Sequence, residues 1–377
     1  MNIFQRKKTE YSSGSLSREA WKKFLRNKLS LAALIYILFS FMVALLGYLI
    51  TPDNTPMTNR QTLELATKRP GFSILMLKVL KEDDIPKEGI FHRMLFGQRS
   101  KYQYLPVEDY EYSNGQLKIR EYTGEDGVPG PERAFRLNEN QIKDQLTKSR
   151  FLLGTDQFGR DVLSRLMIGS RVSLAVGMIS VIISLLIGVT IGSLGGFFRG
   201  WVDKVVVWLI NVVWSIPTLL LVIAITFALG KGFWQVFVAV GFTMWVEVAR
   251  ITRGQILALR EKEYVEAAKA LGFSNYRIIF RHILPNATGP IIVISAANFA
   301  AAILIEAGLS FLGIGVQPPM PSWGSMIREN YAYLILDAAH LAVLPGLAIM
   351  LIVLSFMIIG NGLRDALDVK TQGKIQT

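Results

Sequence analysis

The chain has 377 residues and no cysteine, which excludes disulfides and thiolate metal sites. Its hydrophobic share of 51% and charged share of 19% depart only modestly from the roughly 45–50% and 25% of soluble domains, so the average does not decide the class. The formal net charge of +12 raises the question of a nucleic-acid partner, and the three histidines lie too far apart in sequence to predict a metal site.

The first expected element is a basic amphipathic helix over residues 15–29, SLSREAWKKFLRNKL. Helical spacing places Leu16, Ala20, Phe24 and Leu25 near one face, with basic residues around the rest. This pattern predicts an interfacial helix on the cytoplasmic surface of a membrane. A solvated basic leader is the alternative.

A first membrane span is predicted at Leu31–Ile50. No charged residue occurs for about 20 positions, the length that crosses a hydrocarbon core of roughly 30 Å. The run is too long for the apolar region of a cleaved signal peptide, and no small-x-small cleavage site follows it. We therefore predict a signal anchor.

A polar stretch over 51–150 follows and is too long for a structureless loop. Its composition predicts a helix around Asn59–Leu80 and short strands near Tyr102–Leu105 and Gln116–Tyr122. Asn114-Gly115 between the two strands is a typical hairpin turn. We expect a small α+β insert on the extracytoplasmic side, serving as a cap or docking surface.

The remainder of the chain is dominated by long apolar runs. Five further runs occupy Val172–Phe198, Val205–Leu229, Phe233–Ala249, Ala287–Val316 and Leu341–Gly362. With the first run they predict an all-α polytopic membrane protein with six transmembrane helices. Pro217 is expected to kink the third span. Glycines on the second span are expected to allow close helix packing: Gly177, Gly188, Gly192, Gly195 and Gly196.

The basic residues gather on one side of this alternation. They precede span one, separate spans two and three, and follow span four; the last group is Arg250, Arg253, Arg260, Lys262, Lys269, Arg277 and Arg281. The positive-inside rule then predicts a multi-pass protein of the cytoplasmic (inner) membrane, with both termini in the cytoplasm. The basic excess is a topology signal rather than a nucleic-acid footprint.

The most informative segment is EYVEAAKALGFSNYRIIFRHILPN at 263–286, on the predicted cytoplasmic side. We expect a helix over 255–271 that Gly272 ends, then a second helix over Ser274–Leu284 before Pro285. The small alanines of the first helix allow a partner surface to approach closely.

This segment resembles the cytoplasmic loop of permease subunits of binding-protein-dependent ABC importers. Glu-Ala-Ala, three residues and Gly, then hydrophobic-Leu-Pro, match that family; His282 stands where the general pattern has isoleucine, in the form typical of the dipeptide, oligopeptide and nickel branch. The resemblance implies a type I importer permease fold, in which this loop is the coupling helix seated in an ATPase subunit. The implied coupling residues are Glu263, Tyr264, Glu266, Ala267, Ala268, Lys269, Leu271, Gly272, Leu284 and Pro285.

Two further segments resemble the second, C-type, permease of that branch. One is LGTDQFGRDVLSRLMIGSRVSL at 153–174, where Asp156, Arg160 and Asp161 are expected to lock one another by ion pairs or to contact a solute-binding protein. The candidate contact residues are Gly154, Thr155, Asp156, Gly159, Arg160 and Asp161. The other is EAGLSFLGIGVQPPMPSWG from Glu306, whose three prolines end the preceding helix. LRDALD at 363–368 is also similar, and the resemblance covers Ser17–Ile50 and Phe151–Val369.

Polar residues inside a bilayer are costly and face protein or water rather than lipid. Asn211, Asn298 and Glu306 are therefore candidates to line the pathway, and helix–helix hydrogen bonding is the alternative.

The chain carries no phosphate loop, catalytic triad or paired carboxylates. We expect a non-catalytic subunit without cofactor of its own, with ATP and Mg on partner chains. The expected partners are a second permease, two cytoplasmic ATPases, an extracytoplasmic solute-binding protein and the lipid bilayer. Peptides are the default cargo of this branch; nickel chelates, opines and peptide-like antibiotics are alternatives. A secondary transporter or channel, an intramembrane enzyme and a scaffold are the rival classes.

The expected division of the chain follows from these assignments. It comprises a leader over 1–30, a first helix over 31–50, an insert over 51–150, a core permease domain over 151–369 that contains the coupling loop 250–286, and a cytoplasmic tail over 370–377.

Overall fold

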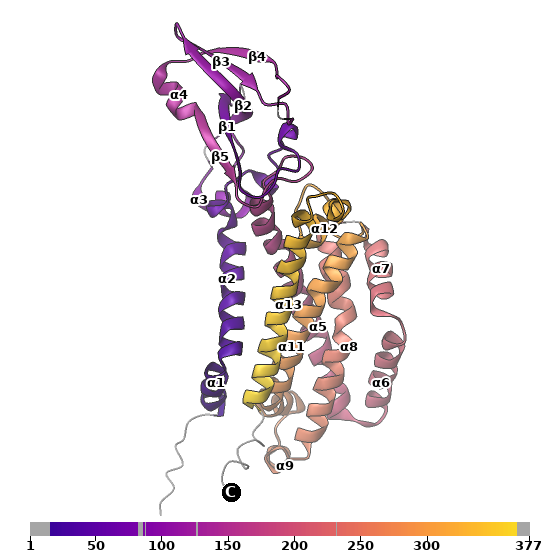
Figure 1. The fold of residues 1–377 in the computed structure, drawn as a ribbon. Helices are drawn as coiled ribbons and strands as arrows, with labels where there is room; N and C mark the ends of the chain where they lie inside the picture. The colour runs from indigo at the N-terminus through magenta and orange to yellow at the C-terminus, as the bar shows by residue number, and fades with distance from the viewer. Residues whose placement is uncertain (1–15, 82–85, 87, 126, 231, 368–377) are drawn as a thin grey trace, which may run out of the picture.

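The structure, a computed structural model, describes residues 16–81, 86, 88–125, 127–230 and 232–367. The leader before residue 16 and the predicted tail over 370–377 lie outside these ranges. A bundle of long helices carries a small β-sheet domain at one end, and α1 and α9 lie at the other end (Figure 1). The mostly helical architecture with a sheet-containing insert agrees with the predicted fold class.

The chain begins with α1 (Leu16–Arg26) and α2 (Lys28–Ile50). Asn27 separates them, because its side-chain oxygen accepts hydrogen bonds from the backbone N–H groups of Leu29 and Ser30 and so caps α2. Phe24 of α1 is buried against the C-terminal helix of the bundle, while Trp21 stays exposed. The helix therefore packs on the bundle, which favours the amphipathic helix over the solvated leader.

The insert contains more elements than the sequence predicted. Short 3-10 turns at Pro56–Thr58 and Leu63–Leu65 precede β1 (Phe72–Leu80). The expected helix over Asn59–Leu80 is therefore wrong. Then come α3 (Ile90–Phe96), β2 (Tyr102–Ser113), β3 (Gln116–Glu121), β4 (Glu132–Arg136), α4 (Glu139–Gln145) and β5 (Leu146–Phe151).

The five strands form one antiparallel sheet of order β4-β3-β2-β1-β5. The predicted strands near Tyr102 and Gln116 are confirmed as β2 and β3. Both residues of their connection, Asn114 and Gly115, have positive φ, as the predicted Asn-Gly hairpin turn requires. Leu77, Leu117 and other apolar side chains form the core of this domain.

Among the described residues, the bundle has five helices long and apolar enough to cross a membrane, and one bent pair. The long helices are α2, α5 (Val162–Phe198), α8 (Phe233–Arg260), α11 (Leu284–Phe311) and α13 (His340–Leu367). The bent pair is α6 (Gly200–Trp214) and α7 (Thr218–Leu229), which meet at 89°. Pro217 stands directly before α7, so the kink predicted there is confirmed.

Close packing of α5 on α8 depends on the glycines of α5. A Cβ added at Gly188 or Gly192 would lie 2.6 Å from the carbonyl oxygen of Trp245 or 2.4 Å from that of Ala249. No side chain fits there, so the two backbones approach directly, as the glycine pattern predicted.

The segment between α8 and α11 differs in part from the expected pair of helices. The chain turns at Glu261, so α8 ends at Arg260 and α9 (Glu263–Ala270) is a separate helix. After α10 (Asn275–Arg277) a π-helical turn, η3 (Ile278–Ile283), leads into α11 without a break. The expected end before Pro285 is wrong, because proline is tolerated in the first turn of a helix, where no N–H donor is needed.

The remaining elements close the end of the bundle that faces the sheet. α11 ends at Phe311, before the three prolines, and Gly313 adopts a positive φ. α12 (Trp323–Asn330) and a 3-10 turn, η4 (Tyr331–Leu334), lie at the same end as the sheet and lead into α13 (Figure 1).

Candidate functional site

The inner hairpin, residues 261–286, lies at the end of the bundle away from the sheet (Figure 1). Val265 and Ala268 on one face of α9 are buried together with Phe197, Ile256 and the isoleucines of η3. This apolar cluster holds α9 against the ends of α5 and α8. The hairpin is thus packed as a unit rather than suspended as a loop.

The glycine at the end of α9 closes the hairpin. Gly272 has φ +75°, its N–H donates to the Lys269 carbonyl at 2.9 Å, and the Phe273 N–H donates to the Ala268 carbonyl at 3.1 Å. These two bonds form the Schellman C-cap that the sequence predicted from Gly272. The guanidinium of Arg277 lies 4.2 Å from the centre of the Phe273 ring and braces the next turn.

The opposite face of the hairpin is exposed and unusually apolar. Leu271 is 72% exposed and Tyr276 is 71% exposed, and Tyr264 and Phe280 are also exposed. Of the ten predicted coupling residues, Ala268 is buried, Leu284 is half-buried and eight are exposed; the eight are Glu263, Tyr264, Glu266, Ala267, Lys269, Leu271, Gly272 and Pro285. Within the described part of the chain, Glu266 forms no ion pair. Such a surface is typical of one that a partner covers.

Polar contacts join the inner ends of the helices next to the hairpin. Arg253 of α8 binds Asp203 of α6 through Nη2 and Oδ2 at 2.7 Å. Arg260 donates to the Phe197 carbonyl at the end of α5. The inner ends of α5, α6 and α8 are therefore linked just above α9.

The outer turn, residues 154–161, lies at the sheet end. Asp156 accepts hydrogen bonds from the backbone N–H groups of Phe158 and Arg160 and from Nε of Arg160 at 2.6 Å. Asp161 instead caps α5 by accepting from the Ser164 N–H at 2.8 Å. The predicted lock between Asp156 and Arg160 is confirmed, while Asp161 has a different role. Burial of Asp161 raises the pKa of its carboxyl above the ordinary value of 3.8.

All six candidate contact residues of the outer turn are buried within the chain. A Cβ at Gly159 would lie 1.7 Å from the Thr62 carbonyl, and the Thr155 N–H donates to the Lys68 carbonyl at 3.1 Å. The insert covers this turn. Their burial favours the ion-pair lock over direct contact with a binding protein.

Two charged residues of the turn belong to a larger group of charges. We call this group the charge cluster; its members are Asp156, Arg160, Arg165 and Glu329. Glu329 of α12 accepts from Nη2 of Arg160 at 2.6 Å and from Nη2 of Arg165 at 3.3 Å. Nε of Arg165 lies 3.5 Å from Asp156 Oδ2. Sequence reasoning missed Arg165 and Glu329, since no local spacing connects them.

The three polar candidates inside the membrane part lie in different surroundings. Glu306 is fully buried, and its carboxylate accepts from Ser310 Oγ at 2.7 Å and Ser173 Oγ at 3.3 Å. Asn298 is also buried, with Nδ2 3.5 Å from the Met244 carbonyl. Both join helices, which favours the helix–helix alternative for them. Asn211 is exposed on α6.

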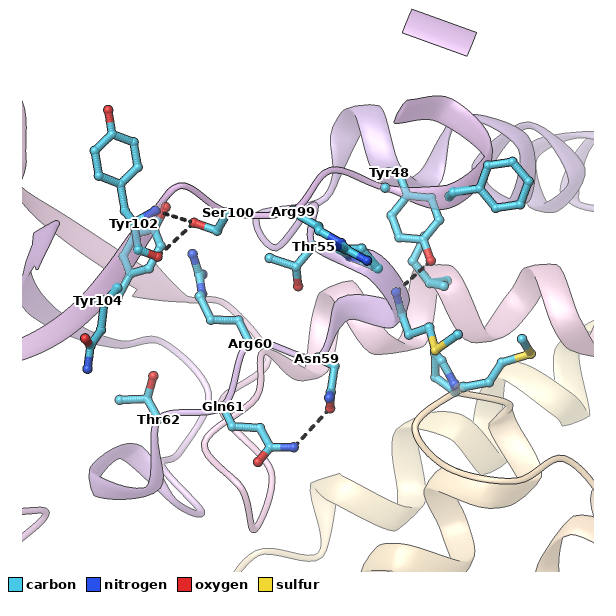
Figure 2. A pocket seen from close by; sticks show the side chains of 18 of the residues that line it. Tyr48, Thr55, Asn59, Arg60, Gln61, Thr62, Arg99, Ser100, Tyr102 and Tyr104 are labelled. Atoms are coloured by element: carbon cyan, nitrogen blue, oxygen red, sulfur yellow. Dashed lines mark hydrogen bonds between the residues drawn. The ribbon is translucent and has the colours of Figure 1, made fainter. Parts of the chain in front are cut away.

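A cleft of about 1460 Å³ separates the insert from the bundle; we call it the outer cleft. Insert residues such as Arg60, Arg99 and Tyr104 line it (Figure 2), and the guanidinium of Arg60 lies 4.3 Å from the centre of the Tyr104 ring. Bundle residues that include Val172 of α5 and Phe233 of α8 form the opposite wall. The volume exceeds the roughly 300–1,000 Å³ of small-ligand pockets. No sequence pattern indicated this cleft.

The fold and these sites define a protein with several helices long and apolar enough to cross a membrane, a packed hairpin at one end and a cleft beneath the insert at the other. Comparison with known proteins identifies the class. Residues 188–373 match the family described as binding-protein-dependent transport system inner membrane component. Residues 15–66 match the N-terminal TM domain of oligopeptide transport permease C. The insert beyond residue 66 lies outside both matches.

Curated relatives of this chain are permease proteins of transport systems, in agreement with the family matches. The chain is 42% identical over 235 residues to the glutathione transport system permease protein GsiD of Pectobacterium atrosepticum, covering 62% of this chain and 76% of that protein. It is 43% identical over 217 residues to the dipeptide transport system permease protein DppC of Alkalihalophilus pseudofirmus, covering 58% and 71%. Among solved structures, the inward-facing MetNI methionine ABC transporter matches with 18% identity and a TM-score of 0.46, over 54% of this chain and 97% of that chain.

The chain belongs to the family of binding-protein-dependent transport system inner membrane components. It is a permease subunit of an ABC importer and works with ATPase and binding-protein partners. The family predicted from the Glu-Ala-Ala loop is confirmed, and the rival classes of secondary transporter, enzyme and scaffold are not supported.

Proposed function

We propose that this chain is a non-catalytic transmembrane subunit that imports peptides by alternating access. In this proposal it pairs with a second permease and two ATPases, which hold the ATP and Mg. The names of the relatives, a dipeptide and a glutathione permease, support a peptide cargo. Nickel chelates and peptide-like antibiotics are the alternative cargoes.

The proposed topology has six spans of a type I permease, with the bent pair α6–α7 counted as one span. Support comes from Figure 1, in which α1, α9 and the end of α13 lie opposite the insert. With the basic residues of α1 and the inner hairpin facing the cytoplasm, the described ends of the chain are cytoplasmic and the insert is extracytoplasmic.

The exposed apolar face of the inner hairpin is the observation that carries the coupling role. We assign Leu271, Tyr276 and Phe280 to the contact with an ATPase, beside the exposed Glu266 and Ala267 of the Glu-Ala-Ala motif. Since Val265 and Ala268 anchor α9 to the bundle, closure of the ATPases would move hairpin and helices together. The hairpin acts as a lever.

The outer cleft is the proposed entrance for cargo. Tyrosines offer flat apolar surfaces to peptide side chains, and Arg60 and Arg99 offer charge to a peptide carboxylate. Val172 and Phe233 belong to the long helices α5 and α8, so the cleft meets the bundle there. Exposed Asn211 remains the candidate to line the pathway farther in.

The test replaces Leu271 by Asp on the exposed face of the hairpin, with Val128→Asp on the exposed insert as the matched control. We expect the Leu271 variant to reach the membrane, lose co-purification with the ATPases and lose ATP-driven uptake of labelled dipeptide, while the control retains all three. Uptake at the control level by Leu271→Asp would contradict the coupling role. Unlabelled dipeptide and a nickel chelate are then compared as competitors of the labelled dipeptide. The compound that inhibits the labelled uptake identifies the class of cargo.

A further inference from the structure

The short helix α3 exposes an apolar surface within the insert. Phe91 is 76% exposed and Ile90 is 65% exposed, and Leu95 and Phe96 are also exposed. Four of the seven residues of the helix are thus large, apolar and uncovered. Leu95 and Phe96 line the outer cleft, whereas Ile90 and Phe91 do not, and large apolar side chains exposed in this way on a polar domain indicate a partner.

The position of α3 beside α2 indicates which partner covers it. Figure 1 shows α3 at the sheet end of α2. On α2, Leu38, Met42, Leu45 and Leu49 are exposed and follow one another at helical spacing. The other face of α2 is buried, so this row faces outward from a span that is long and apolar enough to cross a membrane. Lipid is its expected surrounding.

Arg171 of α5 fixes α3 to that outward row. Its guanidinium donates to the carbonyls of Ala44 and Leu45 on α2 at 2.8 and 3.0 Å, and to those of Met94 and Leu95 on α3 at 2.9 and 2.6 Å. Met94 and Leu95 are among the last four residues of α3, whose carbonyls lack partners within the helix, and the helix dipole favours a cation there. One guanidinium therefore joins Leu45 and Leu95, whose side chains are both exposed.

Arg171 thereby holds α3 beside the outward row of α2 at the level where the span ends. A protein partner would have to cover both surfaces at once, and lipid already meets the first. Short amphipathic helices at this depth lie in the plane of the membrane, with the apolar side in the acyl boundary.

We propose that α3 is an anchor in the outer leaflet of the bilayer, with Ile90 and Phe91 inserted among the acyl chains. His92 lines the outer cleft, where its ring lies 2.9 Å from the Glu88 carboxylate, so the polar side of α3 faces away from the proposed lipid contact. Because Leu95 and Phe96 also line the outer cleft, the anchor fixes one wall of the cleft relative to the membrane. The proposed occupant is phospholipid, and the proposal is independent of the cargo.

The absence of cysteine from the sequence makes a direct test simple. Phe91→Cys is labelled with an environment-sensitive fluorophore in the assembled importer, reconstituted into phosphatidylcholine vesicles that contain a shallow doxyl-lipid quencher. Leu45→Cys on the lipid-facing row is the positive control, and Glu111→Cys on the exposed face of β2 is the negative control.

We expect the label at position 91 to be quenched by the doxyl lipid several-fold more than the label at position 111, and to resist aqueous iodide. Quenching equal to that at position 111 overturns the proposal. So does protection from both quenchers, which would place a protein partner over α3.

A second variant tests the anchor through Arg171, whose guanidinium joins α3 to α2. Lysine cannot reach four carbonyls as a planar guanidinium does, so Arg171→Lys is expected to reduce the lipid quenching at position 91 by several-fold while quenching at position 45 remains. Unchanged quenching at position 91 would show that Arg171 does not hold the anchor. The single-cysteine comparison decides the lipid contact even if the Arg171 variant fails to assemble.

Discussion

The charge cluster offers a sharp test of how the outer end is held together. Glu329 of α12 and Asp156 of the outer turn supply two negative charges to the guanidinium groups of Arg160 and Arg165. The cluster is electrically balanced and almost closed to solvent. Glu329→Gln keeps the shape of the side chain and removes one negative charge.

The expected cost follows from burial. The variant leaves two buried guanidinium groups with one carboxylate, and an uncompensated buried charge costs about 3–5 kcal/mol. Since the Glu329 side chain keeps a small exposed fraction of 14%, we expect the lower part of that range. Nη1 of Arg165 has no hydrogen-bond partner among the described residues, so Arg165 is the less satisfied of the two cations.

A compensating variant separates charge balance from packing. Arg165→Met combined with Glu329→Gln restores neutrality, and replacing a buried ion pair by apolar groups is often close to neutral. We expect the double variant to recover most of the stability that Glu329→Gln alone loses.

The assay is reversible unfolding of the purified chain in mixed micelles with increasing denaturing detergent, followed by circular dichroism. Single and double variants are measured beside wild type, with uptake activity of the assembled importer as a second readout. The reasoning is wrong if Glu329→Gln changes the unfolding free energy by less than about 0.5 kcal/mol, the range of ordinary surface substitutions. It is also wrong if the double variant is no more stable than the single variant.

Three further predictions concern other parts of the chain. Gly192→Leu is expected to prevent stable assembly, because its Cβ would lie 2.4 Å from the Ala249 carbonyl, whereas Gly254→Ala meets no atom within 4 Å and should express normally. Gly272→Ala at φ +75° should cost about 1–2 kcal/mol and lower coupled uptake, with the ATPase rate measured alongside. Asp161→Asn keeps a helix cap and removes a carboxyl whose folded-state pKa is raised. The stability advantage of this variant over wild type should therefore grow as the pH rises above the unfolded-state pKa near 3.8. A difference in stability that does not depend on pH would contradict this.

The sequence predicted the spans because long apolar runs are a direct consequence of bilayer thickness. It failed at β1, where FSILMLKVL contains leucine and methionine that suit a helix as well as a strand. The strand forms because β2 and β5 pair with it on both sides. β2 was predicted, but β5 was not, and no local pattern indicates that these two distant strands pair with β1.

The same distinction applies to the sites. Gly272 was predictable, since a helix that ends in a tight return needs a residue with positive φ. The break at Glu261 was not, because neither glycine nor proline marks it. The charges of the outer turn left an ion-pair lock and a partner contact both open, but Glu329, 169 residues after Arg160, and the overlying insert bury them. Burial is a property of the assembled fold rather than of the local sequence.

The two ends of the molecule are connected by one uninterrupted helix. α8 has 28 residues, a length of about 42 Å at 1.5 Å per residue, and runs from Phe233 on the wall of the outer cleft to Arg260 beside the inner hairpin. The glycine contacts of Gly188 and Gly192 hold α5 tightly along it, and α5 carries Arg165 and Arg171 at its outer end. Because close-packed backbones deform little, a displacement of the hairpin moves α5 and α8 as one body. In the proposed mechanism, the wall of the outer cleft on α8 would shift together with α5 and with α3, which Arg171 joins to α5, so a displacement imposed at the hairpin would reach the entrance.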